Sequence, residues 1–531
     1  MKSISLFGLL YLCLFNNGYS QNDVLPDSNF GTNGEVTSPY GDFTLEFAAI
    51  AIQPDGKLVT YGPINPSYDY DLINDYKLAR YNTDGSLDTT FGNSGFQYII
   101  SCYRSYYLSI SPKNQLKIQP DGKILIVRTF DTIAHPGIAY FDVIINRFNP
   151  DGSLDTTFGN NGEVVRDYTD YDIPTSIEIQ PDNKILVAGY SGLNTMIFRL
   201  NSDGSADKSF GIDGTVLDSF KPFNWSSYIY SSNFIRSVKL QSDGKIILGG
   251  ESLQNDGRNP DIGFMRLNPN GTLDTSFGIG GIFVYESGND DNFNTLSITP
   301  ENKIVVFFNS SVFYSSNVIP SAKIFRLNTD GKFDVTFGIN GISTQMLNTT
   351  ASLPLNAFID VAVDANQKFV FIGHAGATNI GNPYTKFIGR YNSDGSIDTT
   401  FNSDGYQLIT TANLNNLSVQ DDGKILYGGN NMTRLLFGTL SNTEFNKNEF
   451  SIFPNPFSDK ITLKFNFKSV EVLSVDLYDS FGRKIKNLLN ENSFLTGNNS
   501  IQLNMPETLS KGIYFLKITN GMKISAIKIM K

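Results

Sequence analysis

The chain has 531 residues, a formal net charge of −11 and a sequence pI of about 4.8. It is too long for one ordinary hydrophobic core, and 40% hydrophobic with 18% charged residues is a globular rather than a disordered composition. The acidic balance argues against nucleic acid and anionic membranes as partners, because both require a basic patch. With two Cys and two His, we expect no disulfide framework, no metal and no other cofactor.

Residues 1–20 have the pattern of a cleaved export signal. Lys2 supplies the positive start, Ile4 to Phe15 are apolar, and the small residues Gly18 and Ser20 precede a cut before Gln21. This pattern predicts Sec-dependent passage to the periplasm. No later stretch approaches the roughly 18 consecutive apolar residues of a membrane-spanning helix, so we expect no transmembrane segment.

Residues 21–442 contain a recurring motif, R-[YFL]-N-x-[DN]-G-x-x-D-x-[TS]-F-[GN]. Its first full copy runs from Arg80 to Gly92, and a truncated second half, Asp27 to Gly31, opens the mature chain. The Phe of the motif recurs at intervals of 52 to 67 residues, a period typical of repeat architectures. The repeated Phe residues are Phe30, Phe91, Phe158, Phe210, Phe277, Phe337 and Phe401.

A second motif lies halfway through each period and reads IQPDGKIL in the copy that starts at Ile118. Asp-Gly between two apolar runs predicts a β-hairpin with a type I′ turn, whose two central residues both need positive φ. Residues before the turn alternate in polarity, and those after it are continuously apolar, as in strands covered on both faces. One more strand follows each Phe-Gly pair and another precedes each Arg, so each period holds four strands.

Seven four-stranded units predict an all-β fold with a seven-bladed β-propeller. The alternative is a linear array, which requires polar capping repeats that the first and last units do not show. The last unit lacks the Phe-Gly linker, and the chain start supplies it, as in a ring closed by its two ends. Two registers stay open. The strand after Phe-Gly either begins its own unit or completes the preceding one, in which case Glu35 to Ser38 complete the last blade.

Together, the two motifs resemble the delta-60 β-propeller repeats of secreted bacterial proteins. The resemblance covers about seven units and implies the propeller fold. It implies no particular activity, because one fold can carry many unrelated functions.

Residues 443–450 form a short polar joint, after which Lys becomes frequent. In residues 451–531, short alternating strands such as Lys460 to Phe467 predict a small Ig-like β-sandwich. The motifs PNP, YDxxGR and GIYxxKI, which start at Pro454, Tyr478 and Gly512, have the order found in the type A C-terminal sorting domain of the type IX secretion system, which this segment resembles. The resemblance implies recognition by the type IX machinery and delivery to the outer cell surface or medium. The alternative is a structural or carbohydrate-binding sandwich that stays on the protein.

The N-x-D-G-x-x-D core of the repeat has a spacing like part of the loops that bind Ca²⁺. The first ligand position, however, is an Arg in every full copy, as at Arg80. A guanidinium there would repel the cation and pair with Asp84 or Asp88. We therefore expect a structural turn that locks the crossing between blades, with calcium as the alternative.

Successive loops of a blade alternate between the two faces of a propeller. The Asp-Gly turn and the Asp-rich linker are near constant in length and share one face, the constant turn face; the other two loops vary and share the variable loop face. Function tends to lie on variable loops, and exposed aromatic rings suit stacking on sugars or anchoring a protein. The candidate binding residues are Tyr68, Tyr70, Trp225, Tyr228, Tyr230 and Tyr314. The alternative for each ring is packing of its loop against the blades.

The sequence therefore favours a secreted or cell-surface propeller that binds a glycan or a protein and is not an enzyme. The alternative is a polysaccharide-active lyase or hydrolase with paired carboxylates, but no residue is singled out as catalytic. Acids in or near the variable loops include Asp69, Asp71, Asp75, Asp142, Asp167, Asp170, Asp172, Asp261, Asp290 and Asp291.

Overall fold

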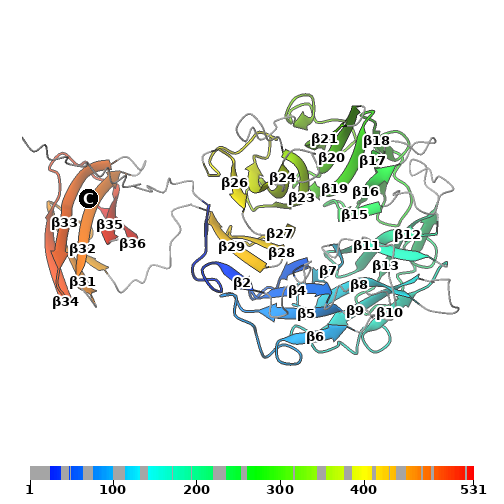
Figure 1. Cartoon of the computed structure of the whole chain (residues 1–531), viewed down its shortest axis with the longest axis horizontal. Helices are drawn as coiled ribbons and strands as arrows, with labels where there is room; N and C mark the ends of the chain where they lie inside the picture. Colours follow the sequence, from blue (N-terminus) through cyan, green and yellow to red (C-terminus); the bar gives the residue numbers. More distant parts are fainter. Residues whose placement is uncertain are drawn as a thin grey trace, which may run out of the picture. The chain divides into compact units, whose positions relative to one another are not determined.

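The computed structural model divides the chain into two compact units, Met1–Thr439 and Leu440–Lys531 (Figure 1). In the parts of the chain that the structure describes, every regular element is a β-strand. The expected signal at residues 1–20 lies outside these parts, as does the joint except for its last residue. The described residues are 24–37, 47, 49–63, 76–99, 114–131, 141–169, 171–192, 194–218, 235–252, 260–314, 317–343, 355–375, 385–402, 404–409, 414–429, 431–437, 450–467, 470–479, 484–520 and 523–531.

The first unit has seven antiparallel sheets among its described residues, with their first strands around a common centre (Figure 1). One sheet has the order β3 (Ala49–Ile52), β4 (Leu58–Pro63), β5 (Tyr76–Tyr81), β6 (Phe96–Ile99). Five more sheets follow the same order: β7 (Leu116–Ile118), β8 (Ile124–Asp131), β9 (Phe141–Phe148), β10 (Glu163–Arg166); β11 (Asp172–Ile179), β12 (Ile185–Ser191), β13 (Asn194–Leu200), β14 (Thr215–Asp218); β15 (Ile235–Leu240), β16 (Ile246–Ser252), β17 (Asp261–Leu267), β18 (Ile282–Tyr285); β19 (Asp290–Ile298), β20 (Ile304–Tyr314), β21 (Asn317–Leu327), β22 (Ile342–Ser343); and β23 (Leu355–Val363), β24 (Phe369–Ala375), β25 (Thr385–Tyr391), β26 (Tyr406–Ile409).

The seventh sheet joins the two ends of the unit. It contains β27 (Leu414–Val419), β28 (Ile425–Gly429) and β29 (Asn431–Phe437), and β29 pairs with both β1 (Val24–Pro26) and β2 (Glu35–Thr37). The strand after each Phe-Gly pair is thus the outer strand of the preceding sheet, which decides between the two registers. This closure also excludes the linear array.

The Asp-Gly hairpins form as predicted, but the type I′ turn is wrong. Gln53 N donates to the Lys57 carbonyl at 2.8 Å, which leaves a three-residue loop. Of the residues between them, only Gly56 has positive φ, at 82°. The loop takes the three-residue form that places Gly in the left-handed region, and it does so also between Gln241 and Lys245, where Ser242 stands in the place of Pro54.

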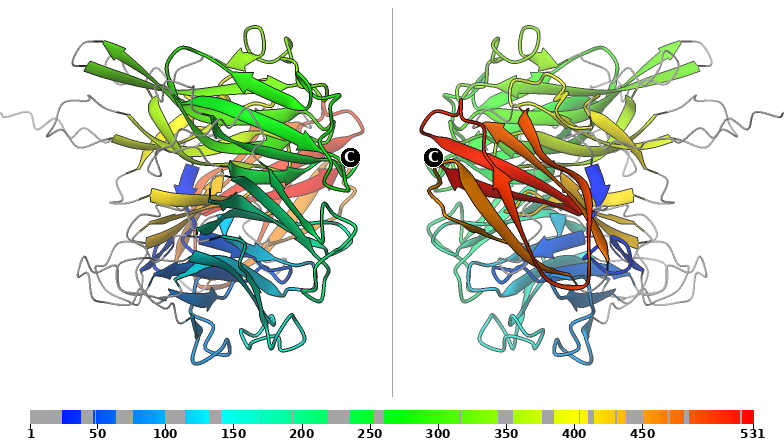
Figure 2. Two further views of the ribbon diagram at one scale, coloured as in Figure 1. Left: turned by 90° about the vertical axis from the view of Figure 1, so that its right-hand side faces the viewer. Right: turned by 90° about the vertical axis from the view of Figure 1, so that its left-hand side faces the viewer.

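The core of the first unit lies between neighbouring sheets. Leu125 and Val127 on β8 share one apolar cluster with Ile177 and Val187 of the next sheet. Their neighbours Ile124 and Ile126 pack into the cluster on the other side, so β8 is covered on both faces, as its unbroken apolar sequence predicts. All seven repeated Phe side chains are fully buried. The hairpin β20–β21 is longer than its neighbours and projects past them at one end (Figure 2).

The second unit has two sheets whose apolar side chains form one core. Ile461 and Leu463 from the first sheet pack with Leu473 and Leu516 from the second. The first sheet contains β30 (Phe450–Phe453), β31 (Lys460–Phe467) and β34 (Gly497–Asn504), and the second contains β33 (Lys484–Phe494), β32 (Glu471–Asp479), β35 (Ile513–Asn520) and β36 (Lys523–Met530).

Candidate functional site

On the constant turn face, the repeated Arg, Asp, Lys and Phe form one cluster in each of the six full repeats. Arg199 Nε and Lys184 Nζ donate to the same Asp207 oxygen at 2.6 and 2.9 Å, and the guanidinium lies 4.7 Å from the centre of the Phe210 ring. The other Asp207 oxygen accepts from the Ser209 amide and hydroxyl. Burial opposes ionisation of Asp207, but these hydrogen bonds hold its pKa well below the usual range.

The same cluster fastens each sheet to the next. Arg199 Nη1 donates to the Pro269 carbonyl at 2.6 Å, and the Gly211 amide beside the buried Phe donates to the Asn270 carbonyl at 2.9 Å. Both acceptors belong to the linker of the following sheet. We name this set of contacts the interblade clamp.

The truncated motif at the chain start completes the clamp of the last sheet. Arg434 Nη2 lies 2.7 Å from Asp27 and its guanidinium 4.3 Å from the Phe30 ring centre, while Nη1 donates to the carbonyl of Thr83 in the first sheet. The predicted pairing of Arg80 with Asp88 is also present, at 2.8 Å. These contacts support the structural interpretation of the Asp-rich turn.

The predicted aromatic binding residues cannot be placed. Tyr68, Tyr70, Trp225, Tyr228 and Tyr230 lie outside the described residues, and their role stays a prediction. Tyr314 is the last residue of β20, opposite Asn317, so its backbone lies at the tip of the projecting hairpin; its side chain is not described.

One aromatic loop on the variable loop face is described, between β10 and β11. The Tyr168 ring packs 6.1 Å from Phe198, and its hydroxyl lies 3.0 Å from the Thr215 hydroxyl, so this ring holds the loop to its sheet. Tyr171 is 39% exposed and lies 5.7 Å from Phe141. In this one loop, Tyr168 therefore packs against its sheet, whereas Tyr171 is exposed as a binding ring would be.

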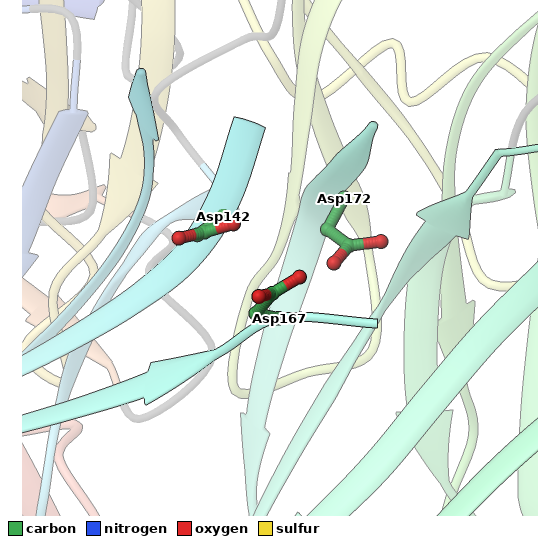
Figure 3. Close-up of side chains that lie close together, drawn as sticks. All are labelled: Asp142, Asp167 and Asp172. Atoms are coloured by element: carbon green, nitrogen blue, oxygen red, sulfur yellow. The ribbon is translucent and has the colours of Figure 1, made fainter. Parts of the chain in front are cut away.

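Three of the predicted acids meet at the variable loop face. Asp142 is the second residue of β9, Asp167 follows β10 and Asp172 begins β11, and the nearest carboxylate oxygens of all three lie within 4.8 Å of one another (Figure 3). A backbone bridge between Phe141 and Tyr171 brings the two sheets together here. Asp167 is exposed, Asp142 half-buried and Asp172 buried. We name this group the acidic cluster.

The three carboxylates differ in their surroundings. Asp172 accepts from the amide of Tyr168 and from the amide and hydroxyl of Thr169, which fixes the loop. Burial, and then the charges of Asp167 and Asp172, raise the pKa of Asp142. The acidic cluster thus places Asp142, which holds its proton more strongly than an ordinary Asp, beside the carboxyl groups of Asp167 and Asp172. The acids Asp69, Asp71, Asp75 and Asp170 lie outside the described residues.

The same acid pattern occurs two sheets later. Asp261, Glu286 and Asp291 stand at the positions of Asp142, Asp167 and Asp172 relative to the repeated Arg and Phe. Asp291 N donates to the Pro260 carbonyl at 2.7 Å, and burial raises the Asp291 pKa. The acids' common spacing from the repeat anchors was the signal that could have singled them out in the sequence.

Residues 451–531 match the family described as secretion system C-terminal sorting domain. Five stretches match the family described as domain of unknown function (DUF5122) beta-propeller: 53–91, 119–158, 180–210, 241–277 and 375–401. The chain carries a DUF5122-type β-propeller and a C-terminal sorting domain. The delta-60 resemblance is consistent with the first match, and the sorting domain marks the protein for type IX export to the cell surface or medium.

The chain is similar to solved structures at low identity. Polysaccharide lyase Uly1 is 10% identical over 75% of this chain and 91% of that chain, with a TM-score of 0.34. The β-propeller domain of the Trilobed protease from Pyrococcus furiosus is 12% identical over 76% and 99%, with a TM-score of 0.36. Such likeness says nothing about function.

No curated protein matches the sequence. Among the described residues, no helix is long and apolar enough to cross a membrane.

Proposed function

We propose that this secreted propeller protein binds a glycan or a protein through its variable loop face and has no catalytic activity. Residues 1–20 direct it to the periplasm, the seven sheets of residues 21–442 are seven blades, residues 443–450 are a joint, and residues 451–531 are an Ig-like sandwich read by the type IX machinery. The protein acts at the outer cell surface or in the medium.

The contrast between the constant turn face and the variable loop face is the observation that supports this proposal most. On the constant turn face, polar groups such as Arg199 and Asp207 bond to one another and to the next sheet. The variable loop face carries the longer loops, the exposed Tyr171 and the acidic cluster. A rigid scaffold that presents unequal loops on one side is a common arrangement for recognition.

A glycan array probed with the purified mature protein tests the proposal, with a screen of extracellular proteins in parallel. We expect saturable binding that Trp225→Ala or Tyr228→Ala weakens at least tenfold. Tyr98→Ala is the matched control, because Tyr98 is a 51% exposed ring on the outer strand β6. Equal loss with Tyr98→Ala, or no ligand of either class, would contradict a role of the variable loops in binding.

A polysaccharide-active enzyme is the second candidate, and the acidic cluster favours it. Retaining glycosidases place two carboxyl groups about 5 Å apart, one of them with a raised pKa. Asp142 has the raised pKa and Asp167 is the exposed neighbour, whereas the Asp172 carboxylate is occupied by its loop. Release of new reducing ends by the mature protein, abolished by Asp142→Asn, would establish this function and overturn the binding-only proposal.

A further inference from the structure

A cavity of about 290 Å³ lies at the centre of the propeller. Its walls come from six of the seven sheets, whose first strands surround the centre of the ring in Figure 1, so it lies on the propeller axis rather than between two blades. The volume is close to the lower end of the range for small-molecule sites, about 300–1,000 Å³, which suits one monosaccharide rather than a longer chain. The polar side chains that line it are Asn114, Lys239, Thr295, Ser297, Asp360 and Asn416.

The described charged groups at this cavity balance one another. Lys239 on β15 lines the cavity and donates to Glu178 on β11 at 2.9 Å, and Lys117 on β7 donates to the same oxygen at 3.3 Å. With the Asp360 carboxylate in the cavity wall, two ammonium groups stand against two carboxylates. A ligand with a net charge would disturb this balance and lose its own hydration, so the cavity favours an uncharged ligand.

One buried group on the cavity wall requires a hydrogen-bond donor. Asn416 is 2% exposed, and its Nδ2 donates to the Phe47 carbonyl, which fixes the direction of the side-chain amide. Its Oδ1 has no hydrogen-bond partner among the described residues. A buried acceptor without a donor is unfavourable, and a hydroxyl group of a ligand would satisfy it.

The rest of the wall has both polar and apolar parts. The Lys239 ammonium has three N–H groups, and Glu178 accepts one of them. The hydroxyls of Thr295 and Ser297 are able both to donate and to accept. The apolar part of the wall includes Ile50, Leu296 and Leu417. A sugar matches such a wall, because its hydroxyl groups donate and accept while its C–H groups form apolar faces.

We propose that this axial cavity binds one uncharged monosaccharide, such as a neutral hexose. A hydroxyl group at one edge of the sugar would donate to Asn416 Oδ1. Hydroxyl groups at the opposite edge would accept from Lys239, which lies three sheets away around the ring. This site is separate from the variable loops, so it does not depend on the function proposed above.

Isothermal titration of the full mature chain tests the proposal, with glucose, galactose and mannose as probes. The uronate and the 2-amino derivative of each hexose serve as charged analogues, at about pH 6, where the first is negative and the second positive. We expect at least one neutral hexose to bind at one site per chain, and its two charged analogues to bind at least tenfold more weakly. No binding of any neutral hexose would overturn the proposal. A charged analogue that binds as tightly as its neutral parent would overturn the preference for an uncharged ligand.

Two substitutions test whether the sugar lies in the cavity. Asn416→Leu removes the unpaired acceptor and Ser297→Leu fills part of the cavity, so we expect each to weaken hexose binding at least tenfold. Asn309→Leu is the matched control, because Asn309 also donates from Nδ2 to a carbonyl of the next sheet, that of Phe358 at 3.2 Å, but does not line the cavity. Wild-type affinity in either folded cavity variant, or equal weakening by Asn309→Leu, would overturn the proposal. The unfolding midpoint of each variant shows whether it is folded.

Discussion

At the scale of single residues, the repeated Arg is the side chain that most directly turns a sequence motif into a ring. Arg199 pairs with a buried Asp of its own sheet, covers a Phe ring and bonds to a carbonyl of the next sheet. Arginine suits this position because its planar fork keeps several donors in fixed directions, which lysine does not. Lys184 joins the same cluster and adds charge, but its ammonium pairs with carboxylates of its own sheet, Asp207 and Asp182.

Replacing Arg199 should destabilise the propeller more than replacing an exposed partner. Arg199→Ala leaves Asp207 buried without its main counter-charge, and breaking a buried pair costs about 3–5 kcal/mol. We expect the free energy of unfolding, measured with urea, to fall by about 3 kcal/mol, because Lys184 remains as a counter-charge. The control is Lys332→Ala, whose side chain is 82% exposed and lies 3.0 Å from Asp330, with an expected change within about 0.5 kcal/mol. Equal effects would contradict the importance of the clamp.

The clamps should also make the propeller sensitive to acid. The pKa of Asp207 is lowered in the folded protein, and that of Asp398 is lowered to about 2. Such groups contribute stability above their unfolded pKa of about 4, and the contribution is lost as the pH falls through the folded value. We therefore expect the difference in unfolding free energy between wild type and Asp207→Asn to be full above about pH 5 and to shrink towards pH 2. A constant difference would contradict this linkage.

At the scale of elements, the blade linker depends on Gly where two sheets come close. Gly152 has φ of 86°, and a Cβ there would lie 2.8 Å from the ring of Phe91 in the preceding sheet. Phe91 is fully buried and cannot move aside without disturbing the core. This Gly is therefore required for both its backbone conformation and its lack of a side chain.

Two Gly→Ala substitutions should separate these two requirements. Gly423 has nearly the same φ, 83°, but a Cβ there meets nothing within 4 Å. Gly423→Ala should cost about 1–2 kcal/mol from left-handed strain alone. Gly152→Ala should cost about 1–3 kcal/mol more, because overpacking is added. Chemical unfolding of both variants tests this, and equal losses would mean that the Phe91 contact adds nothing.

At the scale of the whole molecule, the ring is closed by the two ends of its own chain. β1 and β2 pair with β29, and Asp27 and Phe30 serve the last clamp. Without them, β29 becomes an unpaired edge, which is a template for association.

Removing residues 21–37 from the mature protein should therefore open the ring. We expect a lower unfolding midpoint and concentration-dependent oligomers, measured by differential scanning calorimetry and by light scattering. The control is Asp27→Asn, which weakens the clamp but keeps both closing strands. We expect this variant to have a lower unfolding midpoint and the same oligomeric state as the wild type. A truncated protein with the wild-type midpoint would mean that the closing strands add no stability.

The sequence by itself predicted the repeat, the four strands of each period, the buried middle strands, the Arg–Asp clamp and the export route, but it left open which sheet takes the strand after Phe-Gly. These features depend on contacts within one period or on local motifs, so a one-dimensional pattern contains them. It did not predict the turn type, because Asp-Gly also fits the three-residue loop in which only the Gly has positive φ. The aromatic candidates on the variable loops remain predictions.

Only the tertiary structure decided which repeats bring their side chains together. Lys117 and Lys239 lie 61 residues before and after Glu178, yet both donate to the same oxygen of its carboxylate. Asp142, Asp167 and Asp172 likewise meet from two sheets. The physical reason is that a repeat fixes what each strand buries, whereas the closed ring determines which strands face one another, at the axis and at the boundary between blades.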